Sequence, residues 1–166
     1  MYRIIDAITL ASERHEGQVR RNGTPYIYHP LTVAKMVAQA GYDEKYIITA
    51  VLHDILEDTD TTEDEIEELF GRDILDALLL VTRPEGMPED EYVKGILKND
   101  IASVVKNADK IHNLRDLPNT GKKGEAGCNR KFAERYLAKS RKYYQGKFSK
   151  ELDMALDEAD RFLCKS

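Results

Sequence analysis

The six residues HDILED, from His53 to Asp58, combine one imidazole with three carboxylates in a single short stretch. His53 and Glu57 are four residues apart, as are Asp54 and Asp58, so a helix would place each pair on one face. The neighbouring residues are mostly Val, Leu and Ile, which predicts a largely buried helix. Buried acids are costly unless they are paired or bind a cation. The stretch therefore favours metal binding or acid–base chemistry, and the alternative is a solvated acidic face beside a packed core histidine.

Two other segments supply groups of the same kind. His29 stands just before Pro30 in YIYHP, at the expected start of a helix, and Asp109 lies within the apolar pattern of KNADKIHNL. Two imidazoles and two carboxylates suit a divalent transition ion such as Mn²⁺, Fe²⁺ or Zn²⁺, and two anionic ligands would balance its charge. We therefore expect one metal site that combines His29, Asp109 and the pair His53–Asp54.

Other metal-site patterns are absent from the sequence. DTDTTEDEIEEL, residues 58–69, lacks the glycine at position six of a calcium loop and ends in Leu69 instead of glutamate. No HExxH motif is present, which excludes a zincin site. Cys128 and Cys164 have no CxxC spacing, so we expect free thiols.

The elements that must position these residues are almost all helical, because apolar residues recur at three- and four-residue spacing along most of the chain. This pattern predicts a single all-α domain over residues 1–166, with about eight to nine helices. The expected helices cover Ile4–Ala11, Val33–Ala40, 43–57, Thr62–Gly71, Ile74–Val81, 89–98, 100–114, 129–143 and 150–163. The Pro- and Gly-rich stretch TRPEGMPED predicts a loop, and LPNTGKKGEAG, residues 117–127, predicts a flexible connection.

The composition limits where this chain acts and what it binds. Of its 166 residues, 42% are apolar and 33% are charged, and the formal net charge of −5 does not favour a nucleic-acid partner. No apolar run is long enough to span a bilayer, and the first residues do not form a signal-peptide pattern. We therefore expect a cytoplasmic protein that binds neither membrane nor nucleic acid.

Three motifs in order resemble a known family. ASERHEGQVRRNGTPYIYHPLTVAKMV, AVLHDILEDTDTTEDEIEELFG and VVKNADKIHNLRDL look like the hydrolase domain of the RelA/SpoT homologues, a branch of the HD superfamily of metal-dependent phosphohydrolases. The resemblance is strong over residues 5–117 and weaker over the C-terminal helices, about 129–163. The chain length resembles that of the stand-alone small alarmone hydrolases. This implies an HD-type helical fold and a Mn²⁺ enzyme of the stringent response, which removes the 3′-pyrophosphate from guanosine tetra- and pentaphosphate.

The resemblance also implies roles for individual residues. The implied metal ligands are His29, His53, Asp54 and Asp109, and the implied catalytic acids are Glu57 and Asp58. The implied substrate-binding residues are Arg20 and Arg21 near the purine, Asn113 near the sugar and phosphates, and Lys106 beside the pyrophosphate. A metal lowers the pKa of its bound water and clamps a phosphate oxygen, and an acid one turn beyond the ligands would orient that water or take its proton.

Several polar residues near the motifs are expected to have ordinary structural roles. We expect Tyr26 and Tyr28 to pack within the fold, and His15 and His112 to be helix-packing histidines. Lys110, which neighbours Asp109, is a further candidate cation for the phosphates, but its more common role would be that of a surface charge.

One segment departs from the alarmone hydrolases. Between VTRPEG and KNAD those enzymes have a longer, basic stretch, whereas this chain has MPEDEYVKGILKNDIAS, with Lys94 and Lys98 as its only basic residues. Two alternatives to the guanosine substrate therefore stay open: an HD-type phosphohydrolase of another nucleotide, and a non-catalytic module that binds a nucleotide. The acid pair Glu57 and Asp58 favours an enzyme over a binding module. The native metal and the oligomeric state stay open as well.

Overall fold

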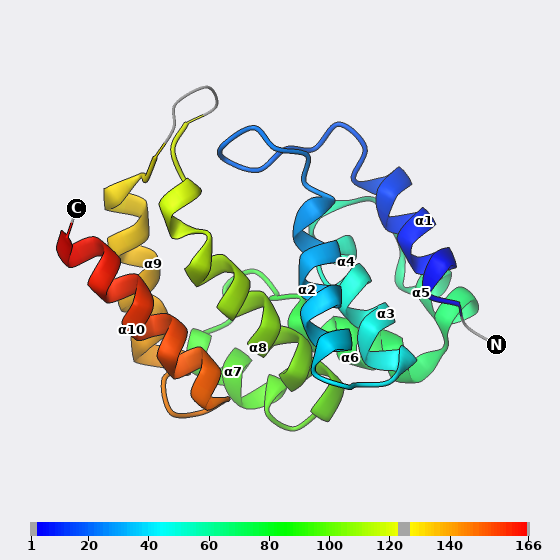
Figure 1. The fold of residues 1–166 in the computed structure, drawn as a ribbon. Helices are drawn as coiled ribbons and strands as arrows, with labels where there is room; N and C mark the ends of the chain where they lie inside the picture. Colours follow the sequence, from blue (N-terminus) through cyan, green and yellow to red (C-terminus); the bar gives the residue numbers. More distant parts are fainter. Residues whose placement is uncertain (1–2, 123–126, 166) are drawn as a thin grey trace.

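The computed structural model describes residues 3–122 and 127–165, and these residues form an all-α fold (Figure 1). The expected fold class is confirmed: the described part contains ten α-helices, one short 3₁₀-helix (η1) and no β-strand. The helices are α1 Ile4–Arg14, α2 Tyr28–Gln39, α3 Glu44–Leu52, α4 Ile55–Asp58, α5 Glu63–Phe70, α6 Arg72–Val81, α7 Glu89–Ile96, α8 Asp100–Arg115, η1 Leu117–Asn119, α9 Arg130–Tyr144 and α10 Lys150–Lys165. Within the predicted connection at 117–127, residues 123–126 lie outside the described residues.

Side-chain caps explain why several helices begin where the pattern places them. The Thr62 hydroxyl accepts a hydrogen bond from the Glu65 backbone N–H at the start of α5, as the predicted capping box requires. Asn99 caps α8 and Asn129 caps α9 in the same way. Gly71 has φ +84°, and this left-handed conformation, which favours glycine, ends α5 directly before α6.

Three expected boundaries are wrong: α1 continues to Arg14, α2 already begins at Tyr28, and the third error concerns the opening motif. We expected one helix over 43–57, but the chain forms α3 up to Leu52 and then a separate four-residue helix, α4. The break lies at Asp54, whose φ of −105° and ψ of 1° leave the α-helical region. The one-face argument for residues 53–58 therefore fails in detail, because the motif is a helix end, a turn and a new helix.

The core has two parts that meet along α8. Buried apolar side chains of α1, α2, α3, α5 and α6 form the larger part together with the first half of α8. The second half of α8 packs with α9 and α10 in the smaller part, and Met36 and Phe148 contact both parts. Figure 1 shows α8 near the middle of the molecule, with α9 and α10 on one side and α2 and α3 on the other. Asp109 in α8 therefore lies where the two halves of the fold join.

The structure also bears on two further expectations, about membrane-spanning helices and about the two cysteines. In the described part of the chain, no helix combines the length and the apolar character needed to cross a membrane. Cys128 and Cys164 are both free thiols, as expected, the first half-buried and the second exposed.

Candidate active site

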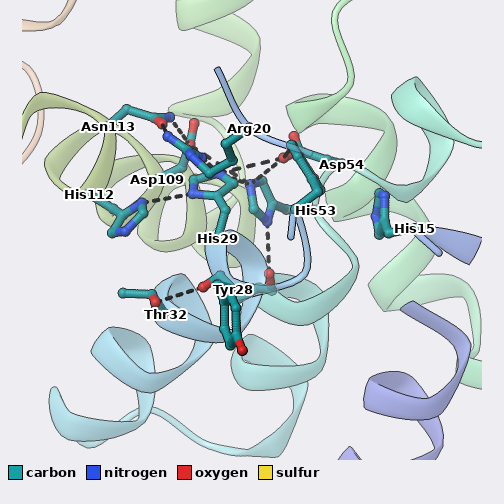
Figure 2. A network of polar contacts seen from close by, with 12 residues as sticks. His15, Arg20, Tyr28, His29, Thr32, His53, Asp54, Asp109, His112 and Asn113 are labelled. Atoms are coloured by element: carbon teal, nitrogen blue, oxygen red, sulfur yellow. Dashed lines mark hydrogen bonds and ion pairs between the residues drawn. The ribbon is translucent and has the colours of Figure 1, made fainter. Parts of the chain in front are cut away.

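Three helices bring two histidines and one aspartate into a single buried cluster (Figure 2). His29 comes from the first turn of α2, His53 directly follows α3, and Asp109 lies in α8. One ligand atom from each lies within 4.8 Å of the other two, and all three residues are buried. The Nε2 atoms of the two histidines are 3.2 Å apart, and His29 Nε2 is 3.2 Å from Asp109 Oδ1.

Asp54, the fourth predicted ligand, stands at the edge of this cluster. Its Oδ2 atom lies 2.9 Å from His53 Nε2 and 3.6 Å from His29 Nε2. The turn between α3 and α4 carries Asp54, so the break in the expected helix lies directly at the cluster. All four residues that the sequence assigned to a metal are thus brought together.

The hydrogen bonds behind the two histidines suit metal binding. His53 Nδ1 is 2.8 Å from the Ala50 carbonyl, which only accepts, so Nδ1 carries a hydrogen and Nε2 is the atom that presents a lone pair to the cluster when the ring is neutral. His29 Nδ1 is 2.8 Å from His112 Nδ1. When His29 Nε2 presents its lone pair to the cluster, its Nδ1–H donates to His112. Two oriented imidazoles with two carboxylates form a donor set that a divalent cation would fit.

The charges in the cluster balance one another. Burial lowers the pKa of His53, but the carboxylates of Asp54 and Asp109 outweigh it and raise this pKa to about 9. Burial likewise opposes ionisation of Asp109, yet Lys106, with its Nζ atom 3.0 Å from Asp109 Oδ2, and the histidines hold the Asp109 pKa well below its usual range. A cation that binds here therefore competes with a proton on His53.

The predicted acid pair lies on α4 beside the cluster. The side chains of Glu57 and Asp58 reach solvent, in contrast to the buried ligands. Partial burial raises the pKa of both carboxyls, and the negative charge of Asp54 adds to this effect, whereas Lys106 acts against it at Glu57. Carboxyl groups whose pKa values are raised by burial and by a neighbouring charge are candidates for acid–base chemistry.

Arg20 and Asn113, predicted to bind substrate, are linked to the cluster by direct hydrogen bonds. Arg20 Nη2 donates to Asn113 Oδ1 and to Asp116 Oδ2, both at 3.0 Å. Asn113 Nδ2 in turn donates to Asp109 Oδ1. Both residues therefore support the position of Asp109 and also face the space beside it (Figure 2).

A cavity of about 270 Å³ adjoins the cluster, and Arg20, Arg21, Tyr26, Asn113, Phe132 and Tyr136 are among its lining residues. The Arg21 guanidinium lies 4.0 Å from the centre of the Phe132 ring. The sequence did not point to Phe132, because an aromatic residue at the start of a helix is an ordinary packing residue in any helical pattern. The cavity combines flat aromatic faces with two guanidinium groups, which suits a planar ring that carries phosphate.

Two residues expected only to pack also contact the predicted ligands. The Tyr26 hydroxyl donates to the Asp54 carboxylate, and His112 contacts His29 as described above. Tyr28 does not pack as expected, because 62% of its surface is exposed. Motif spacing shows these residues to be near the site but does not show which way their side chains point.

Two lysines of α8, Lys106 and Lys110, were candidate cations for the phosphates, and their surroundings in the structure differ from each other. Lys106 lies against Asp109, and its role beside the pyrophosphate stays a prediction. Lys110 is buried, so the expectation of a surface charge was wrong. Its Nζ atom lies 4.8 Å and 4.5 Å from the rings of Tyr136 and Tyr144, and burial lowers its pKa to about 8. Aromatic faces thus take the place of water around this ammonium group.

Comparisons with known proteins agree with this arrangement. A family model described as HD domain matches residues 7–138. The chain is 37% identical over 123 residues to the guanosine-3′,5′-bis(diphosphate) 3′-pyrophosphohydrolase MESH1 of Danio rerio. This matched region covers 69% of this chain and 68% of that protein. It is 36% identical over 119 residues to the 3′-pyrophosphohydrolase of Haemophilus influenzae, covering 65% of this chain but only 18% of that relative.

The solved structures extend the likeness to the whole fold. A metazoan ortholog of SpoT, described as hydrolysing ppGpp, superposes with a TM-score of 0.76 at 28% identity, over 96% of this chain and 94% of that one. A Listeria monocytogenes protein, at 20% identity and a TM-score of 0.60, shares the fold alone. Some relatives are therefore of similar length, whereas the chain spans under a fifth of the long bacterial ones.

Proposed function

The chain belongs to the HD-domain family, and on that premise we propose that it is a metal-dependent phosphohydrolase which removes the 3′-pyrophosphate from guanosine tetra- or pentaphosphate. The observation that carries the proposal is the buried cluster of His29, His53 and Asp109, with Asp54 at its edge and two solvent-reaching acids one turn away. The relatives of similar length carry the name of this activity. Such an enzyme would act in the cytoplasm, where alarmones are found.

We assign the metal to the four cluster residues and expect it to be Mn²⁺. The donor set consists of two imidazoles and two carboxylates, and carboxylates suit Mn²⁺ better than the softer metals. When bound, the ion would supply Lewis-acid activation of water and neutralise phosphate charge. Fe²⁺ and Zn²⁺ are the alternatives that the imidazoles accommodate.

The chain's own residues would divide the remaining work. Glu57 and Asp58 would orient the attacking water and take its proton, and their raised pKa values make them better bases than ordinary carboxylates. Lys106 lies 3.0 Å from Asp109 and would place positive charge next to the leaving pyrophosphate. Asn113, held between Arg20 and Asp109, would position the sugar.

The cavity beside the cluster would hold the base. Arg20 and Arg21 enter it from the loop before α2, and Phe132 enters it from the start of α9. A purine could replace the Arg21–Phe132 contact by stacking between the guanidinium and the ring.

A specific observation favours a second candidate, hydrolysis of a different nucleotide. Two cations of the short segment after α6, Arg83 and Lys94, are already paired with acids, whereas Lys98 has no ion pair among the described residues. Arg83 Nη1 is 2.7 Å from Glu89 Oε2, and Lys94 Nζ is 3.7 Å from Asp90 Oδ2. These two charges are therefore less available to a second diphosphate than unpaired ones would be.

Incubation of the Mn²⁺-loaded protein with guanosine tetraphosphate tests the proposal, with pyrophosphate and GDP as the measured products. The matched control is Asp109→Asn, which we expect to release neither. A panel of nucleotides with single phosphate or diphosphate groups runs in parallel. Cleavage of another nucleotide but not of guanosine tetraphosphate would establish the second candidate. Tight nucleotide binding without turnover by a metal-loaded protein would mean a non-catalytic module.

A further inference from the structure

His15 has an unusual environment for a residue outside the cluster. It follows the last turn of α1 and is only 3% exposed. Its Nδ1 atom lies 2.9 Å from Gln18 Oε1, whereas Nε2 is buried and, among the described residues, has no hydrogen-bond partner. An unpaired buried polar atom costs about 1–3 kcal/mol, and a phenylalanine ring would avoid this cost. The imidazole therefore needs a reason, and Nδ1 is the atom that makes a contact.

The hydrogen bonds around Gln18 define the direction of that contact. Gln18 Nε2 donates to the backbone carbonyl of Asp58 at 2.8 Å, and a carbonyl only accepts. The amide oxygen of Gln18 therefore faces His15, and His15 Nδ1 must carry the hydrogen. A chain of donors thus runs from the imidazole through the glutamine amide to the last residue of α4.

Helix α4 depends on such outside support. It contains only four residues, and a single helical turn has little stability of its own. At its start, the N–H groups of Glu57 and Asp58 donate to the Asp54 carbonyl at 3.2 Å and 2.9 Å. The carbonyls at a helix end lack partners within the helix, and the Gln18 amide supplies one at Asp58. The acid pair is therefore held by Asp54 at one end of the helix and by Gln18 at the other.

The His15 ring also packs toward the cluster. Its centre is 4.9 Å from that of Tyr26, whose hydroxyl donates to Asp54. The segment between α1 and α2 thus contacts α4 through Gln18 and the turn before α4 through Tyr26.

We propose that His15 and Gln18 are positioning residues for the reaction: the His15 Nδ1–H orients the Gln18 amide, and that amide holds Asp58 where it acts on the attacking water. The proposal rests on the proposed function, because it requires Asp58 to take part in acid–base chemistry. Neither residue touches the cluster ligands directly. A displacement of about 1 Å in a reacting group can lower a rate about a hundredfold, so loss of the chain should affect turnover more than binding.

Three variants test the direction of the chain. His15→Phe keeps the ring but removes Nδ1–H, and Gln18→Met keeps the length but removes both amide contacts. We expect each to lower kcat about 10- to 100-fold with KM changed less than about threefold and with metal content unchanged. In His15→Asn, the side-chain amide nitrogen can occupy the place of Nδ1, so kcat should return to within about threefold of the parent. Full activity of Gln18→Met would overturn the proposal, and so would failure of His15→Asn to restore kcat.

The matched control lies on the same helix. Ser12 is exposed and its hydroxyl donates only to the Ile8 carbonyl, so Ser12→Ala should keep full activity. If His15→Phe does not fold, Gln18→Met, a change in a partly exposed loop residue, carries the test by itself. The kcat of the double variant His15→Phe/Gln18→Met should be no more than about twofold below that of the less active single variant, because both substitutions remove the same chain of hydrogen bonds. Multiplied losses would show two independent effects and overturn the proposal.

A measurement without turnover separates this proposal from the proposed function. The side-chain amide protons of Gln18 should exchange slowly in NMR spectra of the parent protein and faster in His15→Phe. Fast exchange in the parent would overturn the hydrogen-bond chain whatever the activity. Slow exchange in a metal-loaded protein that cleaves no nucleotide would refute the proposed function and, with it, the catalytic purpose of the chain.

Discussion

Two buried carboxylates of this protein, Asp109 and Glu89, look alike by burial but differ in their partners. Asp109 is 4% exposed and Glu89 is 7% exposed, and the pKa of each lies below its usual range. Around Asp109 are the imidazoles of His29 and His53, with Lys106 on its other oxygen. These partners include two nitrogen atoms that can present lone pairs to a cation.

The partners of Glu89 are of a different kind. Arg83 and Lys139 contact its Oε2 atom at 2.7 Å and 2.8 Å, and the Tyr144 hydroxyl donates to Oε1 at 2.7 Å. All three act as donors to this carboxylate, and two of them are cations that already balance its charge, so this cluster does not favour a further cation. Glu89 instead joins the segment after α6 to α9. Burial and a lowered pKa therefore do not identify a functional carboxylate, whereas the chemistry of its neighbours does.

The largest effect should come from Asp109→Asn. The amide keeps the shape but loses the negative charge, so the cluster should lose most of its affinity for Mn²⁺. A metal ion supplies several kcal/mol of transition-state stabilisation, so we expect kcat/KM to fall at least about 10³-fold. The measurement is pyrophosphate release, together with metal content by elemental analysis.

The matched variant on the other carboxylate is Glu89→Gln. It should keep the metal and stay within about threefold of the parent activity. A loss of activity in Glu89→Gln comparable to that of Asp109→Asn would mean that the two carboxylates do not differ in the way their partners indicate.

The next largest effect should come from the acid pair. In Glu57→Gln and Asp58→Asn the buried cluster is intact, so both proteins should bind metal as the parent does. General acid–base groups contribute about 10²- to 10⁴-fold to a rate, and we expect a loss of kcat in this range for at least one of the two. Stopped assays over a range of substrate concentrations separate kcat from KM. Parent-like turnover in both variants would remove the pair from the mechanism.

The third effect is on the free energy of unfolding, and here the substitution of Glu89 is the one that should matter. Glu89→Ala leaves Arg83 and Lys139 without their shared partner. Removal of one member of a fully buried ion pair costs about 3–5 kcal/mol. Because the side chains of Arg83 and Lys139 are 35% and 47% exposed, water should compensate in part, and we expect about 2 kcal/mol. Urea unfolding should show a lower midpoint with an unchanged slope, and Ser12→Ala should match the parent.

The sequence predicted the Asp109 cluster but not the Glu89 cluster. The motifs of His29, His53, Asp54 and Asp109 identified a set of residues that the fold brings together, because His29 and Asp109 lie in helices and the pair His53–Asp54 directly follows one. The helix ranges from 89 onward were predicted within about two residues for the same reason. The break at Asp54 was missed, because helical periodicity continues across it and nothing in the residue types marks a turn.

The Glu89 cluster was not visible in the sequence. Glu89 is buried, but in PEDEYVK it stands next to two exposed acids, and its partners Lys139 and Tyr144 are more than 45 residues further along the chain. The same holds for Lys110, whose aromatic neighbours lie on α9. Long-range side-chain pairing depends on how helices pack, and local periodicity contains no information about it.

The smallest effect separates the two kinds of carboxylate by pH. Glu57 and Asp58 must be ionised to act as bases, and their pKa values are raised above the ordinary 4.5 and 3.8, so activity should already fall at a pH above these values. Glu89 has a lowered pKa, so its contribution to stability should be complete above pH 4.5 and disappear only as the pH falls through its lower folded value. The difference in unfolding free energy between the parent and Glu89→Gln should therefore persist at a pH where kcat has already declined.

Because the negative charge of Asp58 helps to raise the pKa of Glu57, the residual activity of Asp58→Asn should decline at a lower pH than that of the parent. An acid limb that does not move, or a Glu89 contribution that vanishes together with activity, would mean that one titration controls both properties and that the two clusters are not independent.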